Sequence, residues 1–388
     1  MNLQNQKRIT HISLIVGLIT TALSVTSLFA HKDIFFQSYL FSFLFWSDLA
    51  LGSLPLLMIY ALTGGQWGAA VRHILEALSD TAFFFAVAAL VILFGLKWIY
   101  PWMDPKVASE VRVIHKQLYL NPITFSLRTL FYFLCWLSLN RLIQNHSETS
   151  YGDSNLKKRI RLRRISAGGL IIMGFSLTFA SIDWQMSVEP TWYSTIYGLV
   201  YIIGQILSAF AFTLIIFGIK ADQQSLQGIF PKKVLRDLGN LLLTLVIVWS
   251  YLSFMQYLIV WSGNLPHEVT WFNHRTEKGW QWLALILALF QFAAPFVLLL
   301  FRSSKDHLFR LVAIGGLIFS IRIVDHYWML MPGIMTQGLK IPWEAMTLWI
   351  GMGGIWLALF LRRLSSKPIF AKGDRDWSIP NQSQNLPV

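Results

Sequence analysis

Residues 178–197, TFASIDWQMSVEPTWYSTIY, decide the fold of this chain. They join an apolar run that begins near Ile165 to a second apolar run that ends near Ile219, and only about eight residues separate the two. A linker of that length is too short to hold an inserted domain. Trp and Tyr side chains prefer the membrane–water interface, and Pro190 suits a turn directly before a helix. We therefore expect a tight turn on one membrane face, between two groups of transmembrane helices.

The composition points to the same class of protein. Of the 388 residues, 55% are hydrophobic and only 13% are charged, whereas soluble domains carry about 25% charged residues. Apolar runs of about 20 residues, enough to cross a ~30 Å hydrocarbon core, recur along the sequence. The only cysteine, Cys135, lies inside such a run, which excludes a disulfide framework and a thiolate iron–sulfur cluster. The sequence predicts an all-α polytopic membrane protein.

The apolar runs define ten predicted membrane spans within an integral membrane domain, residues 1–364. The spans cover residues 11–30, 38–62, 73–97, 124–143, 165–183, 192–219, 236–262, 280–301, 308–331 and 343–362. From about Ser365 the sequence is polar and contains three prolines, so we expect residues 365–388 to form a flexible tail.

Basic residues predict the orientation of these spans. Ten spans place both termini on one side. Of the 32 lysines and arginines, 22 lie at loops and span ends on that side and 8 on the opposite side, with Arg128 and Arg322 inside spans. Because cytoplasmic loops carry the excess of Lys and Arg, we expect both termini in the cytoplasm. The net charge of +13 then belongs to these loops and lipid contacts, and no nucleic-acid partner is expected.

Several ionisable residues fall inside the predicted spans, where such groups are costly and usually face a bundle interior or a wet cavity. The candidate site residues are His73, Asp80, Asp48, Asp183, Arg322, Asp325 and His326, with Arg128 as a possible charge partner at the outer side. Arg322 and Asp325 are three residues apart and share a helix face, so they could pair. That pair is open to two readings, a structural clamp or a functional group. Asp48 and Asp80 have no opposite charge within a turn on their own helix face, which favours a functional reading for both.

The histidines exclude a di-haem cytochrome b. Paired axial histidines must face each other inside the membrane, but His11, His73 and His307 fall at span ends and only His326 lies well inside one. The sequence also contains no Walker loop, no dinucleotide fingerprint and no HExxH zinc motif. We expect this chain to carry no haem and no metal of its own.

Taken together, a set of longer motifs resembles one family of membrane subunits. They are FLFWSDLALGSLPLLM (43–58), LTGGQWG (62–68), RRISAGGL (163–170), TFASIDWQMSVEPTWYSTIYG (178–198), DLGNLLL (237–243), WSYLSFMQYLIVWSGNLPHEVTW (249–271), FAAPFVLLLFR (292–302) and RIVDHYWMLMP (322–332). The chain resembles the NrfD/polysulfide-reductase class, specifically the second such subunit of alternative complex III, a bacterial quinol:electron-acceptor oxidoreductase. It departs from that family in Tyr60–Ala61, where a histidine often precedes LTGG, and in Asp48, where many relatives have a small residue.

The resemblance implies a fold, partners and a role. It implies that spans 2–5 (38–183) and 6–9 (192–331) form two four-helix bundles, with helices 1 and 10 peripheral. It implies an iron–sulfur/molybdopterin-like subunit, multihaem and monohaem cytochrome c subunits and a sister NrfD-like subunit as partners. Haem c and iron–sulfur clusters would then belong to the partners, and the role implied for this chain is proton conduction, with quinone contact as a second role.

Two other functions remain open from the residues. A stand-alone secondary transporter is one, since Pro55 and Pro295 lie inside spans, but glycines do not cluster beside them as in many broken transporter helices. A purely structural anchor is the other, and four intramembrane aspartates argue against it. Under the first hypothesis, we expect a route for protons from His73 and Asp80 through Asp48 to the Arg322–Asp325–His326 group and Asp183.

The topology can be tested directly. Reporter fusions at Ser154 and at Val388 should both report a cytoplasmic location, because both positions follow an even number of predicted spans. A periplasmic signal from either fusion contradicts the predicted orientation.

Overall fold

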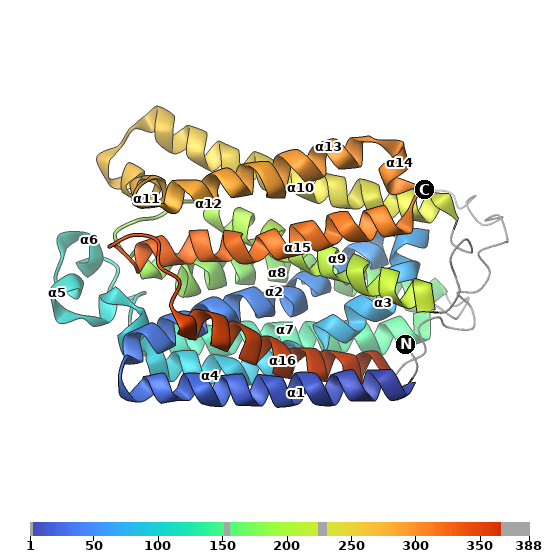
Figure 1. Ribbon diagram of the computed structural model, residues 1–388, viewed down its shortest axis with the longest axis horizontal. Helices are drawn as coiled ribbons and strands as arrows, with labels where there is room; N and C mark the ends of the chain where they lie inside the picture. Colours follow the sequence, from blue (N-terminus) through green and yellow to red (C-terminus); the bar gives the residue numbers. More distant parts are fainter. Residues whose placement is uncertain (1–2, 151–155, 224–230, 366–388) are drawn as a thin grey trace.

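In the computed structural model, residues 3–150, 156–223 and 231–365 are described; Ser154 lies outside these ranges, as does the predicted tail, residues 365–388, apart from Ser365, which ends a helix. Within them the chain is helical and contains no strand. The long helices run side by side along the longest axis of the molecule (Figure 1). The all-α polytopic class predicted from the sequence is confirmed.

The long elements are α1 (Leu3–Val25), α2 (Lys32–Thr63), α3 (Gln66–Ser79), α4 (Ala82–Ile99), α7 (Pro122–Ser150), α8 (Leu156–Trp184), α9 (Tyr197–Gln223), α10 (Lys232–Gly263), α12 (Trp280–Ile286), the π-helix η4 (Leu287–Ala293), α13 (Ala294–Leu300), α15 (Leu308–Leu330) and α16 (Trp343–Ser365). Short elements connect them: η1 (Thr26–Phe29), η2 (Pro101–Met103), α5 (Pro105–Ala108), α6 (Val111–Ile114), η3 (Met186–Val188), α11 (Pro266–Thr276), α14 (Arg302–Lys305) and η5 (Met331–Gly333).

Nine helical segments of the described chain are long and apolar enough to cross a membrane. The predicted ninth span, α15, is not among those nine; it is 23 residues long and carries Arg322, Asp325 and His326. It nevertheless lies alongside the others (Figure 1). The start of α1 and the end of α16 lie at the same end of the molecule (Figure 1), as ten crossings require. Which membrane face that end occupies stays a prediction.

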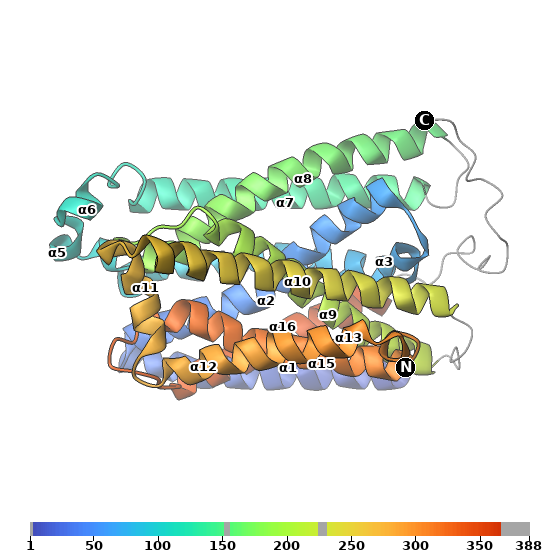
Figure 2. The same cartoon turned by 90° about the horizontal axis from the view of Figure 1, so that it is seen from above.

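Helix α2 occupies the centre of the fold. All of residues 38–58 are buried, because α2 packs against α3, α4, α8, α9 and α16. By contrast, α1 lies at one edge of the molecule and packs along α16 (Figure 1). On another edge α7 and α8 lie side by side (Figure 2). A helix that is apolar all round must be buried on every side, and α2 meets that condition by contacts with these five helices and with α7 and α15.

The division into two bundles stays a prediction. Helix α2 packs on α4 and α8, and α9 packs on α10 and α15, as that division requires. However, α2 also packs closely against α9, across the proposed boundary, and α16 packs on α2 as well as on α1. In the latter contact, the Trp46 indole N–H donates a hydrogen bond of 2.8 Å to the Trp349 carbonyl.

Several predicted spans differ in detail from the structure. The third is divided into α3 and α4 at Asp80–Thr81, where Ser79 and Thr81 hydroxyls donate to the carbonyls of Glu76 and Leu78. Such side-chain bonds to the backbone compete with helix hydrogen bonds. The eighth span is interrupted by a π-helix, and the sixth begins at Tyr197 rather than at 192. Neither interruption changes the periodicity of apolar residues, so neither was predicted from the sequence.

The turn within residues 178–197 docks on α11. Glu189 pairs with Arg275 at 2.8 Å and with His274 at 3.2 Å, while the Trp192 ring stacks on Trp271 at a centroid distance of 4.9 Å. Burial alone would raise the pKa of the Glu189 carboxyl, but the charges and hydrogen bonds of Arg275 and His274 outweigh burial and lower that pKa. The turn is therefore held against α11 by an ion pair and an aromatic stack.

Gly52 sets the distance between α2 and α9. A Cβ atom at this position would lie 2.1 Å from the carbonyl oxygen of Gln205, a backbone atom that cannot move aside. We expect Gly52→Ala to destabilise the purified chain by about 1–3 kcal/mol, as overpacked cores do. The matched control is Gly174→Ala in α8, where a Cβ would meet nothing within 4 Å and where alanine favours the helix.

The measurement is the thermal unfolding midpoint of both variants in detergent. Equal midpoints for Gly52→Ala and the parent chain would show that α2 and α9 can separate without loss of stability.

Candidate functional site

Helices α2 and α15 bring four of the predicted site residues into contact. Asp48 comes from the middle of α2, and Arg322, Asp325 and His326 come from α15; we call these four residues the central cluster. Their side chains are at most 5% exposed. The sequence predicted that Arg322 and Asp325 could pair, and they do so through Arg322 Nη1 and Asp325 Oδ2.

Asp48 is bound by the other members of the cluster. Its Oδ2 atom lies 2.6 Å from His326 Nε2 and 3.3 Å from Arg322 Nη2. The sequence reading found no opposite charge within a turn of Asp48 on the same face of its helix, which is correct for α2. The cationic partner comes from α15, 274 positions later in the chain. Asp48 therefore does have a fixed charged partner.

Helix α9 contributes a hydrogen-bonding side chain and space to the central cluster. The Arg322 Nε–H donates to the Ser208 hydroxyl at 2.9 Å, and that hydroxyl lies 3.3 Å from Asp48 Oδ2. Gly204 gives the guanidinium its space, since a Cβ there would lie 2.5 Å from Arg322 Nη2. The sequence reading missed Ser208 and Gly204. A glycine and a serine four residues apart in an apolar run are common packing residues, so nothing in the sequence separated them from others.

The charges of the central cluster balance only with one additional proton. Two carboxylates and one guanidinium leave one net negative charge, and no further ion pair to them is found among the described residues. An unbalanced charge is very costly in a low-dielectric interior. One proton on either Asp48 Oδ2 or His326 Nε2, which are 2.6 Å apart, makes the cluster neutral. The geometry therefore suits a proton shared between these two atoms.

Buried polar atoms around the cluster also lack partners. Within the described ranges, Asp48 Oδ1, His326 Nδ1, both amide atoms of Gln205 and the Tyr201 hydroxyl are buried without a hydrogen-bond partner. Gln205 and Tyr201 lie four residues apart on α9, which places them on one helix face together with Ser208. Buried polar groups are almost always satisfied by protein or by water. This face of α9 therefore places hydrogen-bonding groups beside the central cluster.

Asp183 belongs to a separate group between α7 and α8. Its carboxylate accepts hydrogen bonds from Arg128 at 2.8 and 2.9 Å and from the Tyr132 hydroxyl at 2.7 Å. Arg128, which the sequence suggested only as a possible charge partner at the outer side, is therefore the partner of Asp183. A bidentate arginine plus a hydroxyl satisfies the carboxylate, and this arrangement is the one expected of a clamp between helices.

Asp80 and His73 form a third group at the α3–α4 break. Asp80 Oδ1 accepts from Gln144 at 2.5 Å and from Asn140 at 3.3 Å, both on α7. His73 lies 3.7 Å from Glu76, which accepts a hydrogen bond of 2.7 Å from Ser147. The predicted route is therefore divided into three polar groups, and no direct hydrogen bond between the groups is found in the described part of the chain.

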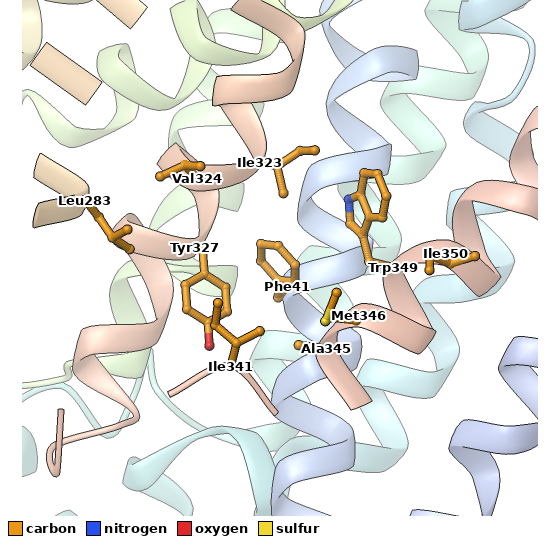
Figure 3. A pocket seen from close by; sticks show the side chains of 10 residues that line it. All are labelled: Phe41, Leu283, Ile323, Val324, Tyr327, Ile341, Ala345, Met346, Trp349 and Ile350. Carbon is orange, nitrogen blue, oxygen red and sulfur yellow. The ribbon is translucent and has the colours of Figure 1, made fainter. Parts of the chain in front are cut away.

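Two cavities flank α15. The first, of about 310 Å³, lies between α2, α15 and α16 and is lined by apolar side chains, with Phe41, Tyr327 and Trp349 facing it (Figure 3). The Tyr327 hydroxyl in this cavity is bound to the Lys340 carbonyl. The second, of about 710 Å³, lies against α10, α11 and η4 and is lined on its α15 side by Asp325, Trp328 and Met329. Only the second cavity reaches a member of the central cluster.

Comparison with known proteins assigns neither a family nor a function to this chain. No protein-family model matches the chain, and a search of curated proteins finds no match. Among the described residues no group of three or more His, Cys, Asp or Glu could hold a metal ion. The expected absence of haem and metal in this chain stays a prediction, as do the implied partners.

The central cluster makes a prediction about stability. Arg322→Leu removes the cation from two buried carboxylates, so we expect a loss of about 3–5 kcal/mol in the free energy of unfolding, typical of a broken buried ion pair. Arg310→Leu is the matched control, because Arg310 lies on the same helix and is exposed. Thermal unfolding of both variants in detergent should show a large shift for Arg322→Leu and a small one for Arg310→Leu; similar shifts would mean that Arg322 does not neutralise the cluster.

Proposed function

We propose that this chain is a haem-free membrane subunit of a bacterial quinol:electron-acceptor oxidoreductase of the alternative complex III type, in which it conducts protons. The family and the partners rest on the motif resemblance described above. The proton role rests on the central cluster. Its cytoplasmic termini and its place in a bacterial inner membrane belong to the same proposal.

The observation that carries the proton role is the incomplete bonding of Asp48. The carboxyl is fully buried; one oxygen contacts His326 and Arg322, and the other has no partner among the described residues. A purely structural carboxylate, such as Asp183, is satisfied on both oxygens. Asp48 instead keeps one acceptor atom for a proton or a water molecule.

The chemistry proposed is a transfer between two adjacent atoms. Toward Arg322, His326 Nε2 can only accept a hydrogen bond, whereas toward Asp48 it can donate or accept. When a proton arrives at Asp48 Oδ1, the shared proton stays on His326 Nε2 and the imidazolium releases its other proton from Nδ1 to an acceptor such as water, so one proton enters the cluster and one leaves it. Arg322 keeps its charge throughout, because a guanidinium is not deprotonated in proteins, and thereby limits how far the cluster departs from neutrality.

The transporter and the oxidoreductase subunit are expected to differ in the proteins that co-purify with them. A transporter works alone, whereas the proposed subunit should co-purify with multihaem and iron–sulfur proteins. Affinity purification of the chain from its native membrane, followed by an optical spectrum, separates the two. A preparation without haem absorption would favour the transporter.

Substitution of Asp48 tests the proton role. Asp48→Asn keeps hydrogen bonding but cannot carry a proton, so we expect intact assembly and a fall of about tenfold or more in proton uptake coupled to quinol oxidation. Asp80→Asn should also lower proton uptake if protons reach the central cluster through Asp80. The control is Asp306→Asn, which removes a partly buried carboxylate paired with Arg236 outside the cluster.

Proton uptake is measured in vesicles containing the whole complex, with turnover recorded in the same sample. If Asp48→Asn turns over and couples like the parent complex, the carboxyl is structural and the proton role is wrong.

A further inference from the structure

A third cavity, of about 520 Å³, lies where the segment after α6 meets the turn before α9; we call it the α6–α9 pocket. Its lining combines polar residues, among them Lys116 and Ser194, with apolar residues such as Ile182. Helix α6 lies at the end of the molecule away from the start of α1 (Figure 1). The exposed ring of Tyr193 also lines the pocket, and such rings favour the membrane–water interface. The pocket therefore lies at the level expected for lipid head groups.

Lys116 is a half-buried cation without a carboxylate partner. Its Nζ atom donates a hydrogen bond of 2.7 Å to the Pro190 carbonyl and lies 5.6 Å from the centre of the Tyr193 ring. No ion pair of Lys116 is found in the described part of the chain, and burial lowers the pKa of its ammonium group. An ammonium group has three N–H donors, so two remain after the bond to Pro190. An anion in the pocket accepts these bonds and offsets the cost of burying the charge.

Ser194 and Thr195, which follow Tyr193 in the chain, add hydroxyl groups to the lining. Ser194 is half-buried and Thr195 is exposed, so a ligand can reach both. A hydroxyl donates to phosphate oxygens and accepts from hydroxyl groups of a ligand. Among the described residues, no Asp or Glu lines the pocket. A cationic head group such as choline or ethanolamine therefore meets the like charge of Lys116 and no counter-charge.

The apolar part of the pocket is a groove between α8 and α9. Thr178 and Ile182 lie four residues apart on α8 and line it from one side, and Gly198 lines it from α9. The two helices are in close contact there, since a Cβ atom on Gly198 would lie 2.6 Å from Thr178 Cγ2. The next residues in each helix, Phe179 and Leu199, are 44% and 50% exposed. The groove thus borders the lipid-facing surface and suits an acyl chain.

We propose that the α6–α9 pocket binds an anionic phospholipid of the phosphatidylglycerol type. Its phosphodiester accepts hydrogen bonds from Lys116, its glycerol head group bonds to the hydroxyls of Ser194 and Thr195, and one acyl chain lies in the groove. The single negative charge of this lipid matches the single lysine of the lining. The inference is independent of the proposed oxidoreductase function, because it rests on the pocket alone.

The test uses the full chain in phosphatidylcholine vesicles that contain a small fraction of phosphatidylglycerol with a photoreactive acyl chain. We expect label on peptides from residues 178–186 or 192–198, about tenfold or more above the label on α7, as one charge-assisted hydrogen bond to the head group allows. Helix α7 reports non-specific lipid contact, because its Leu127, Leu130 and Leu134 are exposed. Equal labelling of α7 and of the pocket peptides would overturn the site.

Competing ligands identify the head group. Unlabelled phosphatidylglycerol should remove the label from the pocket peptides, whereas equal amounts of phosphatidylethanolamine or inorganic phosphate should not. Equal competition by phosphatidylethanolamine would mean that the groove accepts any phospholipid. Equal competition by inorganic phosphate would mean an anion site without a lipid. Either result contradicts the proposal.

Substitutions test the contact with the head group. Lys116→Gln should reduce the label on the pocket peptides to the level of α7, whereas Lys116→Arg keeps the charge and should retain most of the label. Ser194→Trp fills the pocket and should also abolish the preference. The matched control is Lys106→Gln, which removes an exposed cation of α5 outside the lining. If Lys116→Gln is labelled like the parent chain, the ammonium group does not bind the lipid and the proposal is wrong.

Thermal unfolding in the same vesicles separates lipid binding from a structural role of Lys116. A ligand that binds only the folded chain raises the unfolding midpoint. Phosphatidylglycerol should therefore raise the midpoint of the parent chain and of Lys106→Gln, and leave that of Lys116→Gln unchanged. If Lys116 serves only to hold the Pro190 carbonyl, Lys116→Gln lowers the midpoint but still responds to phosphatidylglycerol like the parent chain, which contradicts the proposal.

Discussion

Placing a carboxyl at the centre of a fully buried helix imposes a condition that no residue of α2 can meet. Asp48 is surrounded by apolar side chains of its own helix, so its cation has to come from elsewhere, and Arg322 on α15 supplies it. This contact requires α2 and α15 to lie close enough for an ion pair. Gly204 of α9 makes that possible, because it leaves room for the guanidinium. The relative rotation of three helices thus follows from one electrostatic requirement.

The buried carboxylates Asp183 and Asp48 differ in how completely they are hydrogen-bonded. Asp183 is enclosed by a bidentate arginine and a tyrosine hydroxyl, and both oxygens of its carboxylate accept hydrogen bonds. Asp48 shares its arginine with a second carboxylate and faces a histidine, and one of its oxygens has no partner in the described structure. A satisfied group resists any change of charge, while an under-satisfied group next to a histidine tolerates one. The difference lies in the count of donors rather than in burial, which is complete for both.

The sequence was sufficient for local features and insufficient for those that depend on helix rotation. Apolar runs located the long helices, and the spacing of Arg322 and Asp325 identified a pair within one helix. The partner of Asp48 could not be found that way, because it is 274 residues away and periodicity within α2 is absent when every face is apolar. The break at Asp80 and the π-helix η4 arise from hydrogen-bond choices of the backbone, which hydropathy does not record. Gly52 and Gly204 were indistinguishable from ordinary helix-contact glycines until their neighbours were known.

The separation of Asp48 and Arg322 in the chain has a consequence for biosynthesis. The two residues are 274 positions apart, which corresponds to roughly 14–55 s of synthesis at about 5–20 residues per second. Throughout that interval α2 has entered the membrane while its arginine has not yet been made. The centre of the molecule is therefore completed late, after α15 is inserted. A nascent chain that stops before α15 therefore lacks the arginine that pairs with Asp48.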